Sequence, residues 1–499
     1  MRSSRWATTA PTRSARDTAL PSTACTWVVP APIQAAWSSS APATTPRGCW
    51  RATSASTSGG PNQRSSPPRV LRDTWVTEMT GGAVPDGAAA VPSAETVRGA
   101  VRSWLELNWR PDRALRDWRS ILVDSGWACP TWPRELYGRD LPAELGGIVL
   151  EEIRRAGAVG PAVGVGIGLV APTLLEHGSA EIKLRLLRPI ATGEDAWCQL
   201  FSEPGSGSDL AGLTTSAVRD GDEWVINGQK LWTTGAAHAG YGLLLARTDP
   251  SVPRHEGITA FALPLRQPGI EVRPLRQMNG YASFNEVFIT DARVPQANVI
   301  GVVGAGWGVA RTTLAHERHL AANLLALMPG EAQGRTAQEA MAEALAYFKT
   351  YEWYPQRQGR ADLAPVLARE AGRSVEPLVR QQLAQLYSLE RLMHWMSQRA
   401  SASAARGAKR GPEGSLSKLA ASRLARAAAR THSHIAGAWG LLAGDDAPHA
   451  GVVTEVLLSV PAQSIAGGTD EIQRSIVAEK VLGLPREPQP ADDSSATGG

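Results

Sequence analysis

Apolar side chains in the first folded part of the chain recur at intervals of three and four residues. The spacing is clear over 94–109 and again over 141–153, and it puts the apolar positions on one face of a helix. The stretch 157–175 is rich in Gly, Ala and Val, which suits a buried helix whose small residues let neighbouring segments approach closely. The pattern therefore predicts a helical region from about residue 93 to residue 192.

The pattern changes at Trp197, where short apolar segments separated by Pro, Gly and Asn begin. Residues 213–218 and 224–226 alternate on either side of Asp220-Gly221-Asp222, which is a strong signal for a β-hairpin. Further strand-like runs follow at 241–247, 258–264 and 282–289. This block extends to about residue 300 and predicts an all-β domain of roughly 100 residues.

Helical periodicity returns after the glycine-rich connector 301–306. Residues 328–375 interrupt it with Pro, Gly and weak periodicity. The helical segments are 309–327, 379–400, 416–443, 452–459 and 472–482. Because helices come first, strands second and helices last, the order argues against an alternating parallel α/β fold. It predicts an α+β protein with an N-terminal helical domain, a central β-barrel or sandwich domain and a C-terminal helical bundle.

These changes of pattern define the domains. We expect an N-terminal α domain over 79–195, a middle β domain over 196–300, a C-terminal α domain over 301–487 and a loose tail over 488–499. Residues 1–78 contain only two leucines and cannot bury enough apolar surface to fold. Three interpretations of this segment stay open: translation that starts near Met79, a disordered native arm, or an Arg- and Ser-rich targeting peptide.

Composition excludes several classes of protein. Hydrophobic residues make up 43% of the chain and charged residues 20%, as in ordinary folded proteins. We find no run of the roughly 20 apolar residues that a membrane span needs, so we expect no span. The net charge of +4 comes from residues 1–78, whose nine Arg and three acidic residues leave the remainder slightly negative. A nucleic-acid partner is therefore not expected.

Cysteines and histidines give no sign of a metal site. The four cysteines are scattered and form no CxxC pair, so neither a disulfide scaffold nor a cysteine zinc site is expected. A reducing, cytoplasmic compartment fits this usage. His316 and His319 are three residues apart, which is not the spacing of an HExxH motif. Gly301 and Gly306 bound a connector that lacks the acidic residue of a dinucleotide fingerprint.

Two polar segments of the predicted β domain have the composition of a ligand site. The first is Phe201-Ser-Glu-Pro-Gly-Ser-Gly-Ser-Asp209, whose glycines and serines bring backbone N–H groups and hydroxyls toward one anion or polar ring edge. The second is Asn227-Gly-Gln-Lys-Leu-Trp-Thr-Thr234, where an aromatic ring and hydroxyls end a strand beside the first loop. Each segment alone is more typical of a surface turn, but the pair at this spacing indicates a site.

From about residue 141 to residue 488 the sequence resembles the acyl-CoA dehydrogenases. Besides the two polar segments, the motifs that carry the resemblance are Leu174-Leu-Glu-His-Gly-Ser179, Phe288-Ile-Thr-Asp-Ala-Arg-Val-Pro295, Ala315-His-Glu-Arg318 and Ile465-Ala-Gly-Gly-Thr-Asp-Glu-Ile-Gln-Arg474. The resemblance implies FAD bound between the β domain and the last α domain, often in a tetramer. It also implies a role in fatty acid and lipid metabolism, with electrons passed to an electron-transfer flavoprotein.

The family's reaction needs a carboxylate base. An acyl-CoA thioester loses its α-proton to the base while a hydride leaves its β-carbon for flavin N5. In many members the base is a Glu directly before the Gly-Thr of the C-terminal motif, but this chain has Gly467 there. A minority, including enzymes for branched and long substrates, carries the Glu on the first helix after the β domain. That position matches Glu317, which we expect to be the base, while the Gly467 N–H helps to polarise the thioester carbonyl.

The resemblance also implies roles for other residues. Substrate contacts are expected from Ser208 and, near the CoA end, from Arg318. The predicted FAD contacts are Gln199, Phe201, Ser202, Ser208, Trp232, Thr234, Thr469 and Glu471. For each of these residues, maintenance of the fold is the alternative role.

One departure from the family pattern bears on assembly. The family usually carries an Arg-x-x-Phe-Gly segment that contacts the FAD pyrophosphate of a neighbouring subunit, and none is found around 340–348. A homo-oligomer and a heteromer in which a partner supplies the missing contacts therefore both stay open. So do a non-catalytic subunit, a flavin oxidase or monooxygenase, and a CoA-ester binding module, because one fold supports several functions.

Overall fold

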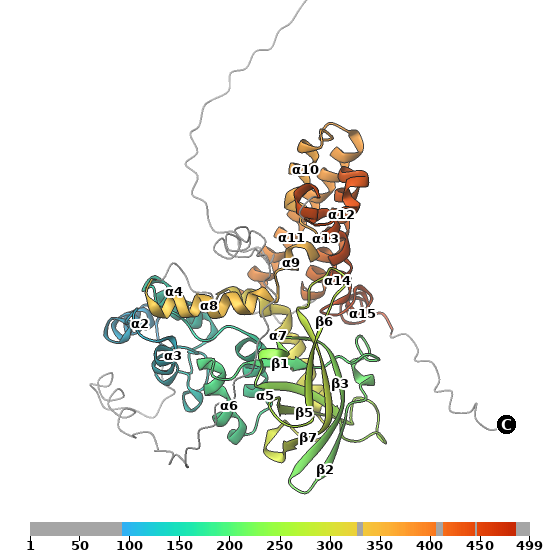
Figure 1. The fold of residues 1–499 in the computed structure, drawn as a ribbon. Helices are drawn as coiled ribbons and strands as arrows, with labels where there is room; N and C mark the ends of the chain where they lie inside the picture. The colour runs from blue at the N-terminus through green and yellow to red at the C-terminus, as the bar shows by residue number, and fades with distance from the viewer. Residues whose placement is uncertain (1–91, 327–332, 406–412, 445–446, 486–499) are drawn as a thin grey trace, which may run out of the picture.

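The computed structural model of the chain describes residues 92–326, 333–405, 413–444 and 447–485 (Figure 1). The predicted extension over 1–78 and the predicted tail over 488–499 lie outside these residues. Helices form the first and last parts of the described chain and a sheet forms the middle part. The α+β architecture predicted from the sequence is thus confirmed.

The N-terminal helices follow the predicted periodicity. They are α2 (Ala94–Asn108), α3 (Leu115–Asp124), α4 (Ala143–Arg155), α5 (Ala171–His177) and α6 (Ala180–Thr192). Helix α2 begins after Ser93, whose hydroxyl accepts a hydrogen bond from the backbone N–H of Thr96 and so caps the helix. Its buried residues Val97, Val101 and Leu105 recur every four positions, so one face of the helix packs into the core.

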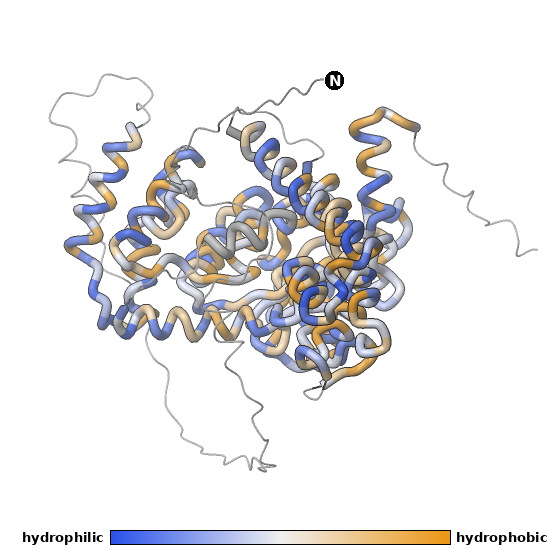
Figure 2. The backbone as a smooth tube through the Cα atoms, turned by 90° about the horizontal axis from the view of Figure 1, so that it is seen from above, coloured by the Kyte–Doolittle hydropathy of each residue, from blue (hydrophilic) through white to orange (hydrophobic). Residues whose placement is uncertain are grey.

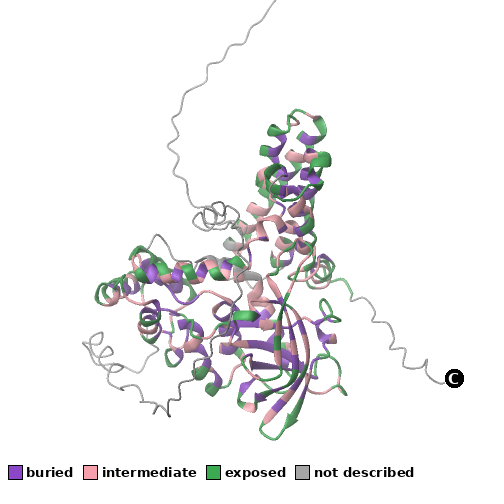
Figure 3. Cartoon of the chain, viewed as in Figure 1, coloured by how far each residue is buried: buried purple, intermediate pink, exposed green. Residues whose placement is uncertain are grey.

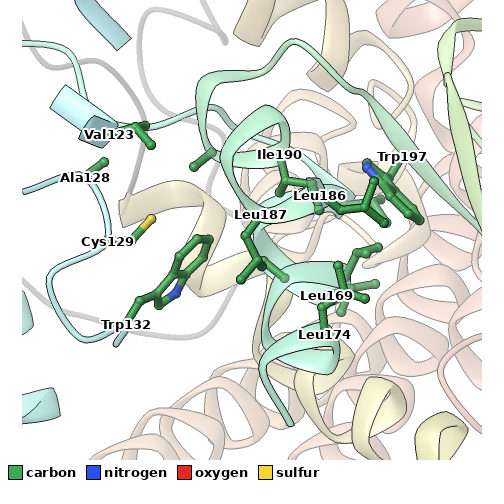
Figure 4. Packing of buried hydrophobic residues seen from close by; sticks show 14 of the residues in the cluster. Val123, Ala128, Cys129, Trp132, Leu169, Leu174, Leu186, Leu187, Ile190 and Trp197 are labelled. Atoms are coloured by element: carbon green, nitrogen blue, oxygen red, sulfur yellow. The ribbon is translucent and has the colours of Figure 1, made fainter. Parts of the chain in front are cut away.

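The small-residue stretch 157–175 differs from the prediction because it is not one helix. The chain is irregular up to residue 164, and helical structure begins at η2 (Gly166–Val170), a π-helical turn that continues into α5. The close approach that we expected is present. A Cβ atom at Gly166 would lie 3.3 Å from Ile190 and 3.4 Å from Trp197, and both of these side chains belong to the core in Figure 4.

The middle of the chain forms one eight-stranded sheet. The strands are β1 (Trp197–Leu200), β2 (Ser216–Asp220), β3 (Glu223–Thr234), β4 (Tyr241–Arg247), β5 (Ile258–Pro264), β6 (Ile270–Leu275), β7 (Phe284–Pro295) and β8 (Val299–Ile300). Their order is β6-β7-β3-β2-β4-β5-β8, and β1 pairs with β4 in parallel. The predicted hairpin is correct, since Asp220 pairs with Glu223 across a two-residue turn.

The C-terminal helices include the longest in the chain. They are α7 (Gly306–Ala326), α8 (Arg335–Lys349), α9 (Tyr354–Arg357), α10 (Ala364–Glu370), α11 (Pro377–Ala405), α12 (Glu413–Ala436), α13 (Val452–Ser459), α14 (Pro461–Ile465) and α15 (Asp470–Lys480). Leu386 and Leu389 of α11 pack with Leu424 and Ala428 of α12 in a core of their own. Helices α10–α13 project away from the sheet in Figure 1.

Helix α8 lies elsewhere, beside the N-terminal helices (Figure 1). The Glu339 carboxylate accepts a hydrogen bond from the backbone N–H of Leu115 at 2.8 Å. The buried Arg119 of α3 donates to both oxygens of Glu343, at 2.9 and 2.7 Å. The weakly periodic segment 328–375 therefore contains a helix that the sequence pattern did not predict, and this helix covers the N-terminal domain.

Polar and apolar positions alternate along most helices in Figure 2, and buried residues concentrate in the sheet and its neighbours in Figure 3. One described segment, Pro448–Lys480, meets the length and composition of a membrane span, and 33% of its most apolar window is buried. Gly451 has a positive φ angle before α13, and Gly467 and Gly468 have positive φ angles between α14 and α15, so the segment is not one continuous helix.

Candidate active site

Helix α7 brings the predicted base to the end of strand β1. The Gln199 side-chain amide donates to the Glu317 carboxylate, with 3.5 Å between Nε2 and Oε2. The Glu317 side chain is half-buried and does not extend into bulk solvent. Gln199 is itself fixed because β1 pairs with β4 through Gln199 and Leu243. Two predicted site residues that are 118 positions apart in sequence therefore lie together.

Two tyrosines lie within electrostatic range of Glu317. Burial raises the pKa of Tyr351 well above its ordinary value, and the Glu317 charge acts in the same direction. Burial also raises the pKa of Tyr354, which the Glu317 charge raises further and the Arg357 charge lowers. The hydroxyls of Tyr347 and Tyr351 are 3.1 Å apart, and the Arg357 guanidinium lies 4.8 Å from the Tyr354 ring centre. Tyr347, Tyr351 and Tyr354 pack together in one cluster with Phe348.

The loop after β1 is anchored by a buried ion pair. Lys230 of β3 donates to the Glu203 carboxylate at 2.8 Å and to the Phe201 carbonyl at 3.1 Å. Glu203 also accepts backbone N–H bonds from Thr214 at 2.7 Å and Thr215 at 2.9 Å. Burial alone would raise the pKa of Glu203, but the Lys230 charge and these bonds lower it to about 2. The carboxylate is thus ionised at neutral pH.

Strand β3 is bulged beside this ion pair. Its register against β7 shifts between Lys230 and Thr233, and bulges of this kind redirect a side chain. Trp232 lies inside the bulge with a φ of +60°, and the residue is 53% exposed. Its ring meets Phe284 edge-on with 5.6 Å between centres. One ring face is therefore left for another group to stack on.

The polar groups of these two segments are suited to a flavin. Among the described residues, the hydroxyls of Ser202, Ser208 and Thr234 have no hydrogen-bond partner, so they are available to a ligand. The loop glycines are open, because a Cβ atom at Gly205 or Gly207 would meet nothing within 4 Å. An available aromatic face, free hydroxyls and an open glycine loop fit the ring and polar edge of FAD.

The C-terminal loop has consecutive glycines, Gly467 and Gly468, at the position where the family resemblance implies a Glu base in many members. Gly467 and Gly468 have φ angles of +70° and +83°. The Gly467 carbonyl accepts a bond from the Gln473 side chain at 3.1 Å. The Gly467 N–H has no acceptor in the described part of the chain. This N–H is therefore available to a ligand carbonyl, as predicted for the thioester.

A lysine faces this loop. A Cβ atom at Gly467 would lie 3.9 Å from Cε of Lys418. The Lys418 ammonium donates to the Gln463 carbonyl and lies 3.9 Å from the buried Asp470 carboxylate. Burial lowers the pKa of Lys418 to about 8. The sequence analysis assigned no role to this residue, and no local signal in the sequence would place it beside Gly467.

The remaining predicted residues have local partners. The Thr469 hydroxyl caps α15 by accepting from the backbone N–H of Ile472 at 3.2 Å. Glu471 is 78% exposed and lies 3.3 Å from Arg474. The side chain of Arg318 lies outside the described part of the structure. No cluster of three or more His, Cys, Asp or Glu that could hold a metal occurs among the described residues.

Comparison with known protein families matches all three folded regions of this chain. Residues 93–194 match the acyl-CoA dehydrogenase N-terminal domain, 198–292 the middle domain and 366–482 the C-terminal domain. The acyl-CoA dehydrogenase IpdE1 of Mycobacterium tuberculosis is 33% identical over 419 residues, which cover 79% of this chain and 98% of IpdE1. FadE34 of the same organism is 36% identical over 365 residues, but the match spans only 46% of its length.

Two solved assemblies share the fold. The Tcur3481-Tcur3483 steroid ACAD has a TM-score of 0.55 and 28% identity, and the match covers 80% of this chain and 100% of that one. The ChsE4-ChsE5 complex from Mycobacterium tuberculosis has a TM-score of 0.54 and 27% identity, with the same coverage. Both names describe assemblies of two different polypeptides.

Proposed function

This chain belongs to the acyl-CoA dehydrogenase family, and from that premise we propose that Glu317 takes the α-proton of an acyl-CoA thioester in a flavin-dependent dehydrogenation. The observation that carries this proposal is the contact between Glu317 and Gln199, because it joins the only site carboxylate of α7 to the strand edge expected to meet the cofactor. A base must be held in place near the reacting centre, and the bond from the Gln199 amide to the half-buried Glu317 carboxylate supports this role.

The cofactor is proposed to be FAD, which when bound accepts the hydride that leaves the β-carbon. The side chains of Gln199, Ser202 and Thr234 would hold its ring edge, and Trp232 would pack against the ring. Phe201 and Ser208 would complete the contacts from the β domain, and Thr469 and Glu471 would reach it from the C-terminal loop.

Other residues of this chain would prepare the α-proton for removal. The free N–H of Gly467 would donate to the thioester carbonyl, so that the charge left by proton abstraction is stabilised. Ser208 and Arg318 would contact the CoA part of the substrate. The tyrosines beside Glu317 would exclude water, which protects the reaction from side reactions with solvent and oxygen.

A bulky acyl group is the proposed substrate class. A base on the first C-terminal helix is compatible with branched, long or sterol-derived chains. A relative with 28% identity is described as a steroid ACAD, which favours the sterol-derived option. The enzyme would act in the cytoplasm and pass its electrons to an electron-transfer flavoprotein.

A partner-dependent subunit is the second candidate, and one observation favours it. The usual Arg-x-x-Phe-Gly segment is missing around 340–348, where the structure instead has helix α8 packed on the N-terminal domain. A second polypeptide would then complete the FAD site. The two solved assemblies described above also contain two different polypeptides.

The test is an anaerobic titration of the purified flavoprotein with straight-chain, branched and steroid-derived CoA thioesters, followed through the visible flavin absorption. We expect bleaching with the bulky thioesters and an enoyl-CoA product. A yellow protein that no thioester bleaches would contradict the proposed dehydrogenation. Rapid oxygen consumption with substrate would indicate an oxidase or monooxygenase, and a colourless protein that gains FAD only with a second chain would indicate the partner-dependent subunit.

A further inference from the structure

A lysine with no exposed surface lies behind the strand edge that is proposed to contact the flavin. Lys230 is in strand β3, and its side chain is 0% exposed. Lysine is almost never fully buried unless it is paired, because removing its charge from water carries a large desolvation penalty. A buried lysine at this position therefore indicates a specific role for its charge.

Both hydrogen-bond partners of the Lys230 ammonium lie in the loop 201–209. The ammonium bonds to the Phe201 carbonyl at 3.1 Å and to Oε1 of Glu203 at 2.8 Å. Oε2 of Glu203 accepts from both the N–H and the hydroxyl of Thr214, at 2.7 and 2.8 Å. The pair is thus the centre of a hydrogen-bond network that joins β3, the loop 201–209 and the start of β2.

The β3 bulge directs the neighbouring backbone to the same loop. Strand pairing between β3 and β7 is interrupted after Lys230, and the N–H of Leu231 donates to the Ser202 carbonyl at 2.8 Å. Two consecutive residues of β3 therefore hold two consecutive carbonyls, those of Phe201 and Ser202. The free hydroxyl of Ser202 belongs to the segment that is held in this way.

Both members of the pair are charged at neutral pH. Burial lowers the pKa of Lys230 to about 8, and the Glu203 charge limits this effect. Since the pKa of Glu203 is about 2, the pair is an ion pair and not a neutral hydrogen bond. A hydrophobic pair would fill the same space at less cost in desolvation, so stability alone does not account for these two residues.

We propose that Lys230 is a positioning residue for the cofactor: its buried ammonium, paired with Glu203, holds the Phe201–Ser202 backbone in the geometry that receives the flavin. This inference rests on the proposed flavin-dependent function. The pair also fixes the electrostatic potential behind the site. Removing Lys230 leaves a buried negative charge, and removing the Glu203 charge leaves a buried positive one.

The test compares Lys230→Met, Glu203→Gln and the double variant. Reduction adds negative charge to a flavin, so a nearby buried charge shifts its midpoint potential. We expect Lys230→Met to make the potential more negative and Glu203→Gln to make it more positive. The midpoint potential of the double variant, which carries neither charge, should lie between the potentials of the two single variants.

The affinity for FAD gives a second measurement. We expect the dissociation constant of FAD, measured by fluorescence titration of the apoprotein, to rise at least tenfold in Lys230→Met.

A matched control is available in the N-terminal domain. Glu152 is 1% exposed in its side chain and pairs at 2.7 Å with Arg102, which is 44% exposed, so Glu152→Gln also removes a buried, paired carboxylate. Glu152→Gln should lower the midpoint of urea unfolding and leave the FAD affinity and the flavin midpoint potential unchanged.

Two results would overturn the inference. One is a shift of the potential in the same direction in both single variants, since a purely structural defect would produce it. The other is an FAD affinity within twofold of wild type in a folded Lys230→Met protein. If Lys230→Met does not fold, the positive shift expected of Glu203→Gln still tests the inference. A wild-type chain that binds no FAD would contradict the proposed function instead.

Discussion

Glu317 is a helix carboxylate, and such residues are ordinarily solvated or paired with a neighbouring turn. Its half-buried position against Gln199 and the tyrosines distinguishes it from that ordinary case. Gly467 has no side chain to act as a base, but its backbone N–H is free to donate a hydrogen bond. In the proposed chemistry, the base therefore comes from α7 and the contact with the thioester carbonyl comes from the C-terminal loop.

Replacing the base tests this assignment directly. Glu317→Gln keeps the size of the side chain and its contact with Gln199 but cannot accept the proton. We expect the rate of flavin reduction in anaerobic stopped-flow to fall at least about a hundredfold, with FAD still bound. The control is Glu176→Gln, since Glu176 is another carboxylate that contacts α7, through Thr312 at 3.0 Å. Reduction at the wild-type rate in Glu317→Gln would remove Glu317 as the base.

Restoring a carboxylate at the usual position should not restore function. In Gly467→Glu the new side chain meets a φ of +70°, which costs about 1–2 kcal/mol for an L-residue. Its Cβ atom would lie 3.9 Å from Cε of Lys418, so we expect the carboxylate to pair with that ammonium. The double variant Glu317→Gln with Gly467→Glu should therefore stay inactive in the same stopped-flow assay. Recovery of turnover would show that the base position has been assigned wrongly.

Acid should weaken the flavin loop through Glu203. The pKa of this carboxyl is 4.5 ordinarily and about 2 in the fold. The ionised form is favoured in the fold, so its contribution to stability is complete above pH 4.5 and is lost as the pH falls toward 2. We expect the urea midpoint of the wild type to decrease between pH 6 and pH 3 more steeply than that of Glu203→Gln. Parallel curves would contradict the role of this ion pair in stability.

At the scale of elements, local patterns predicted the segments whose structure is decided locally. Strands β4 and β5 have the bounds that alternation and turn residues indicated. The hairpin around Gly221 is present, but its strands, Ser216–Asp220 and Glu223–Thr234, are shifted or longer than the predicted 213–218 and 224–226. Strand β6 was not predicted, because it is largely exposed, contains Pro274 and is specified by its pairing with β7. Helix α8 was not predicted either, because its place depends on contacts with residues more than 200 positions away.

The same distinction applies to the site. The loop 201–209 and the segment 227–234 were identified from their residues, and Glu317 and Gly467 from the family resemblance. The ion pair between Lys230 and Glu203 was missed although both residues lie within those segments. A lysine in an otherwise alternating strand is the signal that could have found it. Its burial, however, depends on how β3 packs against the loop.

Helix α8 supplies a prediction at this scale. Arg119 is 4% exposed in its side chain and relies on Glu343, which is 41% exposed. Glu343→Ala leaves the buried Arg119 guanidinium without its carboxylate partner. We therefore expect the free energy of unfolding to fall by about 1–3 kcal/mol. This loss is smaller than for a fully buried ion pair, because solvent reaches Glu343. The control Arg273→Ala breaks the exposed ion pair with Glu271 and should change the free energy of unfolding by less than about 1 kcal/mol. Equal effects of the two variants in urea unfolding would contradict docking of α8 through this pair.

At the scale of the whole molecule, large exposed apolar side chains gather on the C-terminal helices. Tyr387, Leu392 and Trp395 of α11 are 64%, 50% and 54% exposed, and Trp439 and Leu441 are 66% and 79% exposed. Surfaces of this kind ordinarily mark contacts with other proteins. The solved assemblies that share the fold contain two kinds of chain, and we expect a neighbouring subunit of this protein to contact these side chains.

A charge placed on this surface should therefore disrupt the assembly. Trp395→Lys puts an ammonium where we expect an apolar interface, and burying an unpaired charge is costly. We expect light scattering to give the wild type a mass well above the 53.0 kDa of one chain and the variant a lower one. If a neighbouring subunit supplies part of the FAD site, the ratio of flavin to protein absorbance should fall with the mass. Val218, on a strand of the β domain, is 64% exposed, and Val218→Lys is the matched control. This variant should keep both the mass and the flavin-to-protein absorbance ratio of the wild type. A wild-type protein with the mass of one chain and a full complement of FAD would show that the site is complete within a single subunit.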